Sequence, residues 1–138
     1  MDSKQTIIYM EQIKSLSDKR LIVECTLNGK KACFLIDTGA SVALIAEDKA
    51  RKYGLSKGRR FPGTIVGAGG EMDGVYYCNT FARLAGRDIP QFLLADISGV
   101  RESIRRETGI EILGIISLPQ MKIAGIQIDA NDNLIIVE

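Results

Sequence analysis

The sequence contains no histidine and no tryptophan, and it has only three cysteines among its 138 residues. Without histidine, neither a Ser-His-Asp triad nor a Cys-His pair is available to activate a nucleophile. A zinc site would also lack its commonest nitrogen ligand, and the cysteines form no C-x-x-C pair. Any catalysis must therefore depend on carboxylates or lysines, and we expect neither a cofactor nor a metal.

Long apolar runs and an excess of one charge are also lacking. Eighteen basic residues balance 17 acidic ones, which predicts binding to neither nucleic acid nor a membrane surface. Near the start of the chain, the apolar run Ile7 to Met10 is too short for a signal peptide or a membrane span. The scattered cysteines are typical of reduced thiols. Together these absences predict a cytoplasmic protein.

The length and the hydrophobic content indicate one domain. A chain of 138 residues, 46% of them hydrophobic, can bury one core and has no room for a second. We expect residues 21–138 to form this domain and residues 1–20 to be an N-terminal strand or arm. Patterns typical of strands dominate, so the predicted fold is mainly β with about two short helices.

The clearest local signal is the dipeptide Asn28-Gly29, which favours a two-residue type I′ hairpin turn. This turn sets Cys25 opposite Ala32 and Val23 opposite Phe34, on one continuous apolar face. Cys33 then falls on the other face from Cys25, so no disulfide is expected between them. The other predicted elements are helices at residues 46–53 and 98–108, a glycine-rich hairpin of strands 64–66 and 75–77, strands at 80–84 and 91–95 joined by a turn, a buried strand at 112–118, and a last hairpin around 129–133.

Residues 34–41, FLIDTGAS, place a carboxylate at the end of an apolar strand. A carboxylate there loses hydration unless neighbours donate hydrogen bonds, and Thr38 and Gly39 allow backbone N–H groups to approach Asp37. The alternative interpretation is an ordinary turn, because Asp, Thr and Gly all favour turns. The tripeptide alone does not decide between the two.

Three features in chain order resemble the retropepsins, the retroviral-type aspartic proteases, and particularly their bacterial and phage-borne members with an Asp-Thr-Gly-Ala-Ser core. They are FLIDTGAS after the Asn-Gly hairpin, the glycine-rich IVGAGGEMDG at residues 65–74, and ILG at residues 112–114. The resemblance runs from about Leu21 to the end of the chain. It implies a single-lobe, closed β-barrel of the acid-protease type, peptide or protein substrates, and a homodimer.

The resemblance also implies roles for individual residues. Asp37 is the catalytic aspartate, Thr38 hydrogen-bonds to the loop of the partner subunit, and Gly39 lets main chain approach the substrate. The implied flap, which closes over the substrate, consists of Val66, Gly67, Ala68, Gly69 and Gly70. The residues implied to support the active-site loop are Ala40, Ser41, Ile112, Leu113 and Gly114.

Two features depart from the retroviral pattern. Ile115 follows Gly114 where retroviral members usually carry arginine, and the helix predicted at residues 98–108 has no counterpart in the small retroviral enzymes. The geometry of the dimer, rather than the fold, depends on these departures.

Hydrolysis by this route requires two carboxylates that share one proton. Since the chain supplies one Asp-Thr-Gly, the resemblance implies that two Asp37 side chains meet on a two-fold axis. The alternative is a retropepsin-fold module that binds peptides or dimerises without turnover. A dinucleotide-binding loop is disfavoured because Met72 occupies the third glycine position of G-x-G-x-x-G. A phosphoryl-transfer role for Asp37 is also disfavoured, because the sequence offers no acidic cluster to bind Mg²⁺.

Overall fold

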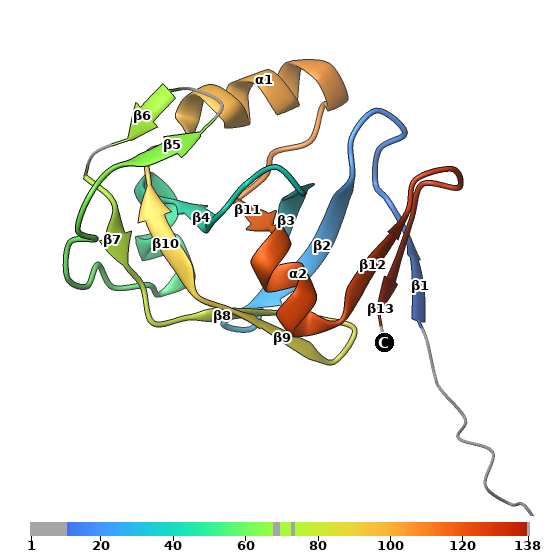
Figure 1. The fold of residues 1–138 in the computed structure, drawn as a ribbon, viewed down its shortest axis with the longest axis horizontal. Helices are drawn as coiled ribbons and strands as arrows, with labels where there is room; N and C mark the ends of the chain where they lie inside the picture. Colours follow the sequence, from blue (N-terminus) through green and yellow to red (C-terminus); the bar gives the residue numbers. More distant parts are fainter. Residues whose placement is uncertain (1–10, 68–69, 73, 138) are drawn as a thin grey trace, which may run out of the picture.

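The computed structural model describes residues 11–67, 70–72 and 74–137. In these ranges the chain is mainly β with two short α-helices, which confirms the predicted fold class (Figure 1). The elements are β1 (Glu11–Lys14), β2 (Ile22–Leu27), β3 (Lys30–Asp37), β4 (Ala43–Ala46), η1 (Glu47–Lys49), η2 (Arg51–Tyr53), β5 (Ile65–Gly67), β6 (Gly70–Met72), β7 (Tyr76–Tyr77), β8 (Phe81–Leu84), β9 (Arg87–Pro90), β10 (Phe92–Ala95), α1 (Ser98–Thr108), β11 (Gly114–Ser117), α2 (Leu118–Ala124), β12 (Ile126–Asp129) and β13 (Leu134–Val137).

The strands form a large curled sheet and two small ones. The large sheet has eight strands in the order β7-β10-β4-β11-β3-β2-β8-β9. The first and last strands of the described chain, β1 and β13, pair with each other, and β12 completes their three-stranded sheet. The hairpin β5–β6 stands apart from both (Figure 1). Among the described residues, no helix is long and apolar enough to cross a membrane.

The hairpin β2–β3 has the predicted turn and register. Asn28 and Gly29 adopt φ values of 49° and 78°, the left-handed conformations that a type I′ turn requires. Cys25 pairs with Ala32 and Val23 pairs with Phe34, as the turn dictates. The Asn-Gly dipeptide therefore fixes which face of each strand enters the core.

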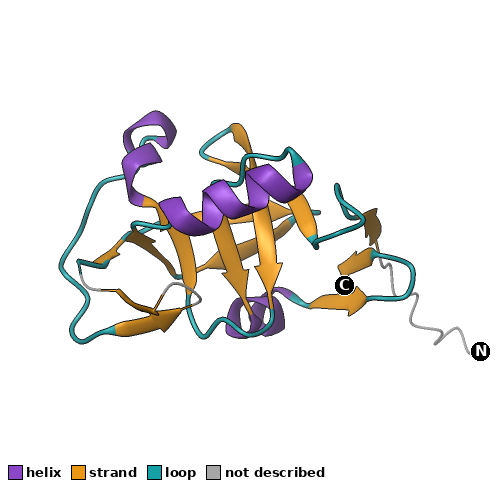
Figure 2. Cartoon of the chain, turned by 90° about the horizontal axis from the view of Figure 1, so that it is seen from above, coloured by secondary structure: helices purple, strands orange, loops and turns teal. Residues whose placement is uncertain are grey.

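The two faces of this hairpin enter two different apolar clusters. Val23 and Phe34 belong to the main core, whereas their neighbours Ile22 and Leu35 point the other way. The smaller cluster consists of Ile22, Leu35, Ile104, Ile112 and Ile115. It lies where α1 crosses the strands (Figure 2), so burial of the opposite face of β2 and β3 holds this helix on the sheet.

The central strand β11 begins at Gly114, between β3 and β4. Gly114 pairs with Phe34 on the parallel side and with Ile45 on the antiparallel side. A Cβ atom at this position would overlap the carbonyl oxygen of Leu44 and would lie 2.9 Å from Cε1 of Phe34. Only glycine leaves room for this approach, and β11 pairs with the strand that ends at Asp37.

Several local predictions were wrong. Within the predicted helix at residues 46–53, Glu47–Lys49 and Arg51–Tyr53 form two 3₁₀ turns, and neither turn has a fully buried residue that would stabilise one longer helix. The segment 85–90 is not only a turn: Ala85 and Gly86 make the turn, and Arg87–Pro90 forms β9. Helix α2 begins at Leu118, the last residue of the predicted buried strand, and Pro119 in its first turn favours a helix start there.

The glycine-rich hairpin also differs from its predicted pairing. Ile65 pairs with Met72 within the hairpin, and the second predicted strand instead contributes Tyr76 and Tyr77 to the edge of β10. Val75, just before them, is buried in the core and draws this segment into the large sheet. The hairpin is therefore shorter than the sequence predicted.

The close approach at Gly114 makes a testable prediction. Gly114→Ala should lower the free energy of unfolding by about 3 kcal/mol, because the added methyl group must displace backbone at Leu44. The matched control is Gly99→Ala in α1, where an added Cβ meets no atom within 4 Å. That control should be neutral or stabilising by up to about 1 kcal/mol. Urea denaturation of both variants measures the difference, and equal stability would contradict the proposed crowding.

Candidate active site

Asp37 is the last residue of β3, and its carboxylate is half-buried at the end of an apolar strand. The Gly39 N–H donates to Asp37 Oδ1 at 2.9 Å, and the Ala40 N–H donates to the Asp37 carbonyl oxygen at 3.1 Å. A Cβ at Gly39 would lie only 3.3 Å from Asp37 Oδ1. The small residue thus brings a backbone donor to the carboxylate and offsets part of its desolvation.

Residues 112–114 connect the two strands that flank this loop through backbone hydrogen bonds. The Leu113 N–H donates to the Cys33 carbonyl at 2.7 Å, and the Leu113 carbonyl accepts from the Ala46 N–H at 2.9 Å. Leu113 therefore ties β3 to the end of β4, on either side of the Asp37 loop. Ile112 and Leu113 are both buried, so little of this brace contacts solvent.

A cavity of about 640 Å³ opens beside Asp37. Its volume is in the range of sites that bind small molecules or peptide side chains. Its walls come from the Asp37 loop, from the hairpin β5–β6 and from α1. The described lining residues are Arg20, Leu35, Asp37, Gly39, Ala40, Ser41, Val42, Leu44, Ile65, Met72, Gly99, Val100, Ser103, Ile104 and Ile115. Most of these side chains are apolar, and Asp37 is the one acidic residue among them.

The hairpin β5–β6 covers part of this cavity through Ile65 and Met72. Of the residues that the sequence implied for a flap, Val66 and Gly67 lie in β5 and Gly70 begins β6. The other two, Ala68 and Gly69, lie outside the described residues. The hairpin and the Asp37 loop are thus brought to the same cavity.

Sequence reasoning missed the contribution of α1. Gly99, Val100, Ser103 and Ile104 face the cavity from this helix. The apolar spacing of Val100 and Ile104 indicated that the helix packs on something, but it gave no sign of the partner. Ile115, noted in the sequence only as a departure, also lines the cavity.

Arg20, at the end of the loop between β1 and β2, was missed as well. Its Nε donates to Glu107 Oε1 at 2.8 Å and its Nη2 donates to Glu107 Oε2 at 3.1 Å. This paired contact raises the pKa of the Arg20 guanidinium, and the charge of Asp37 adds to the rise. The same hydrogen bonds lower the pKa of Glu107. Arg20 therefore brings a fixed positive charge to the rim of the cavity.

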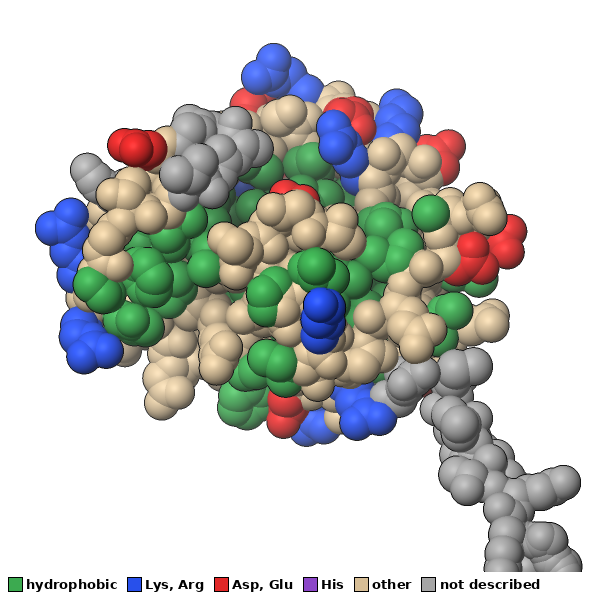
Figure 3. Space-filling model, viewed as in Figure 1, with side chains coloured by type: hydrophobic (Ala, Val, Ile, Leu, Met, Phe, Trp, Pro, Cys, Tyr) green, Lys and Arg blue, Asp and Glu red, His purple; other side chains and the backbone are tan. Residues whose placement is uncertain are grey.

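A second hollow of about 590 Å³ shares Ser41 and Val42 with the first. Its apolar side chains include Phe61, Tyr77 and Phe92, which come from β7, β10 and the loop before them. Figure 3 shows hydrophobic side chains gathered on this face, over β7 and β10. A chain that extends along the Asp37 loop would meet apolar surface in both directions.

The remaining reactive groups do not form a competing site. Burial raises the pKa of the Cys25 thiol to about 12, and burial also raises the pKa of the Cys33 and Cys78 thiols. These thiols are therefore protonated and weakly nucleophilic at neutral pH. Within the part of the chain that the structure describes, no three acidic or cysteine side chains gather as metal ligands. The chemistry that this region offers is that of one carboxylate beside an apolar cavity.

Comparison with known proteins agrees with this arrangement. A family model described as aspartyl protease matches residues 23–116. A search of curated proteins returns no significant match.

Solved structures with similar folds include three retroviral-type proteins. EIAV protease complexed with the inhibitor HBY-793 is 20% identical, with a TM-score of 0.61 over 85% of this chain and 99% of that chain. The retroviral protease-like domain of Ddi1 from Leishmania major is 25% identical, with a TM-score of 0.58 over 86% of this chain and 88% of that chain. A retropepsin-like aspartic protease from Rickettsia conorii is 17% identical, with a TM-score of 0.57 over 94% of this chain and 89% of that chain. The predicted retropepsin-like fold is confirmed.

The ion pair at the cavity rim makes a testable prediction. Because the folded state lowers the pKa of Glu107, the pair stabilises the protein above the ordinary glutamate pKa of about 4.3, and this stability is lost as the pH falls through the lowered value. Glu107→Gln should therefore lower the thermal midpoint by more at pH 7 than at pH 3, where less of the ionised carboxylate remains. Differential scanning calorimetry at both pH values measures the effect.

Glu102→Gln is the control for this experiment. Glu102 pairs with Arg105 inside α1, whereas Glu107 pairs with Arg20 across 87 positions of the chain. Only Glu107→Gln should speed amide hydrogen exchange at Leu16, whose N–H donates to the Ile22 carbonyl in the loop that carries Arg20. Equal exchange in both variants would show that the pair does not hold this loop.

Proposed function

Because the chain belongs to the aspartyl protease family, we propose that it is an aspartic endopeptidase in which two subunits contribute one Asp37 each. The observation that carries the proposal is the position of Asp37, which lines an apolar cavity and has Oδ1 held at 2.9 Å by the Gly39 N–H. Peptide hydrolysis by a water molecule activated between carboxylates needs a second carboxylate beside Asp37. The other described residues around the cavity provide none, so the second carboxylate comes from a second copy of the chain.

The two Asp37 side chains share one proton in the resting dimer. The ionised carboxylate takes a proton from a water molecule as its oxygen attacks the carbonyl carbon of the scissile bond. The protonated carboxylate donates to the carbonyl oxygen, which gives a tetrahedral diol. One carboxyl group then donates its proton to the amide nitrogen, and the other carboxylate takes a proton from a diol hydroxyl as the C–N bond breaks, which releases an amine and a carboxylic acid. The dyad then shares one proton again.

Residues around Asp37 have supporting roles in this proposal. Thr38 is exposed beside the carboxylate, where its hydroxyl can hydrogen-bond to the partner loop. Gly39 is also exposed and lets substrate main chain approach. The loop support comes from the neighbouring small residues and from the brace described above, namely Ala40, Ser41, Ile112, Leu113 and Gly114.

The hairpin β5–β6 acts as the flap in this proposal. Its Ile65 and Met72 already line the cavity beside Asp37. A peptide bound between the hairpin and the Asp37 loop would be shielded from water, which strengthens the electrostatic interactions of the dyad. The inhibitor held by the similar EIAV protease supports a ligand site in a fold of this kind.

Asp37→Asn tests the catalytic role. The substitution removes the charge with little change of shape, so cleavage of an unbiased peptide mixture between pH 4 and 7 should fall by about a thousandfold or more. Mass spectrometry of the products measures the loss. The matched control is Asp88→Asn, which makes the same chemical change in the exposed strand β9 and should cleave like the wild type.

The results separate three cases. Cleavage that is lost only in Asp37→Asn supports aspartic proteolysis. Folded wild-type protein that binds peptides but cleaves none favours the non-catalytic module. Cleavage by Asp37→Asn at the wild-type rate would show that this carboxylate is not the catalyst.

Mixing experiments test whether one site is built from two chains. If wild-type and Asp37→Asn subunits exchange freely, an equimolar mixture should retain roughly half the activity per wild-type subunit, because half of these subunits are then in mixed dimers. Independent monomers would keep full activity. Sedimentation at the assay concentration shows whether dimers are present, and Asp88→Asn in place of Asp37→Asn should cause no loss.

A further inference from the structure

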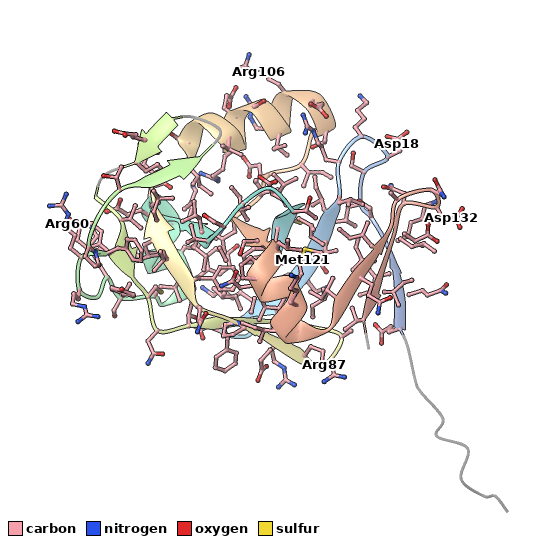
Figure 4. The ribbon with its side chains drawn as sticks, in the orientation of Figure 1. Asp18, Arg60, Arg87, Arg106, Met121 and Asp132 are labelled. Carbon is pink, nitrogen blue, oxygen red and sulfur yellow. The ribbon has the colours of Figure 1, made fainter. Side chains whose placement is uncertain are left out.

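Helix α1 forms one wall of the cavity beside Asp37. Its residues Gly99, Val100, Ser103 and Ile104 line the cavity at positions that recur on one helical face. The opposite face of the helix carries charged side chains, and Figure 4 shows Arg106 directed away from the rest of the molecule. The helix thus presents one small and apolar surface to the cavity and another, charged surface to solvent.

This wall is fixed at both ends. Near its start, Arg101 Nε donates to the Ile112 carbonyl at 2.7 Å, and Arg101 Nη1 lies 3.7 Å from Asp48 Oδ1. Near its end, Glu107 binds Arg20, and its carbonyl accepts from Lys19 Nζ at 3.2 Å. Burial of Ile104 holds the middle of the helix. A ligand in the cavity therefore meets a surface whose position is set before binding.

Gly99 determines how much room this wall leaves. It lies in the first turn of α1, and a Cβ built there meets no atom within 4 Å. Its backbone does not have a positive φ, so the conformation does not require glycine. Glycine costs up to about 1 kcal/mol in a helix relative to alanine. The local structure gains nothing from this glycine, whereas the cavity gains open space.

Apolar side chains surround that space on the other sides. Leu35 and Ile115 form the sheet side of the cavity, and Val100 and Ile104 flank the open space on the helix. Ser103 is exposed one turn further along the same helical face. The space can therefore take an apolar group that is larger than a methyl group, while a charged group would lose its hydration there.

We propose that α1 selects the substrate of this enzyme: the space beside Gly99 receives a large apolar side chain, such as leucine or phenylalanine, of a peptide residue next to the scissile bond. The inference rests on the proposed peptidase function. It adds that Gly99 and Ser103, both on α1, set the size of the accepted side chain.

The experiment compares peptides that differ at one position. The peptide mixture cleaved by the wild type first gives a suitable sequence, which is then synthesised with phenylalanine, leucine or alanine next to the scissile bond. In Gly99→Leu, kcat/KM for the phenylalanine and leucine peptides should fall by about tenfold or more relative to the alanine peptide. Ser103→Leu, one turn along the same face, should shift the ratio in the same direction.

Arg106→Leu is the matched control. It adds the same side chain to the face of α1 that points away from the cavity. Its kcat/KM for the phenylalanine and leucine peptides relative to the alanine peptide should equal that of the wild type. Thermal unfolding checks that each variant is folded, and Gly99→Leu should be at least as stable as the wild type because it removes a helical glycine. Wild-type ratios in both Gly99→Leu and Ser103→Leu would overturn the inference, as would a wild-type preference for alanine.

Binding separates this inference from the proposed function. The same peptides with the scissile amide reduced to CH₂–NH cannot be cleaved, and their affinities can be measured by calorimetry. In one outcome the wild type cleaves nothing, but it binds the phenylalanine peptide more tightly than the alanine peptide, and Gly99→Leu abolishes this difference in affinity. The proposed turnover then fails, and the role of α1 is supported. In the other outcome cleavage depends on Asp37, but Gly99→Leu and Ser103→Leu change neither the kcat/KM nor the affinity of the phenylalanine and leucine peptides relative to the alanine peptide. The peptidase function is then supported, and the role of α1 fails.

Discussion

The absence of a side chain at Gly114 is the constraint on which the rest of the structure depends. It allows β11 to enter between β3 and β4, so close to Leu44 and Phe34 that a methyl group would overlap backbone. Through the adjacent Leu113, the same segment hydrogen-bonds to both neighbouring strands. The Asp37 loop connects these two strands, and its two ends are therefore held at a fixed separation. A carboxylate with one backbone donor at 2.9 Å needs such a frame, because few atoms of the loop itself hold it in place.

The second organising feature is the division of apolar side chains between two clusters. Alternation along β2 and β3 sends Val23 and Phe34 into the main core, and Ile22 and Leu35 to the face under α1. Only part of that second face is covered by the helix, and the uncovered part is the cavity beside Asp37. The hairpin register set by Asn28 and Gly29 therefore decides both how the core is filled and what lines the candidate site.

The sequence predicted the features that depend on local backbone chemistry. The Asn-Gly turn fixed the register of β2 and β3, and Gly109, which directly follows the predicted helix, ends α1 in the left-handed conformation. Features that depend on distant partners were missed or misplaced. The pairing of Tyr76 and Tyr77 with β10 follows from burial of Val75, and the position of α1 on the cavity follows from contacts with Asp48, Arg20 and Ile112. An apolar stripe shows that a helix is buried, but it does not identify the surface that buries it.

Strand β13 lies between β1 and β12, so both of its edges are occupied within one chain. Glu11 pairs with Val137, which means that one sheet joins the two ends of the described chain. Closing so long a loop is entropically costly until the residues between have already folded. The pairing of β1 with β13 therefore completes folding rather than initiating it. The Asn28-Gly29 hairpin, whose partners are adjacent in the sequence, can form first, and the order of assembly runs from the candidate site outward to the chain ends.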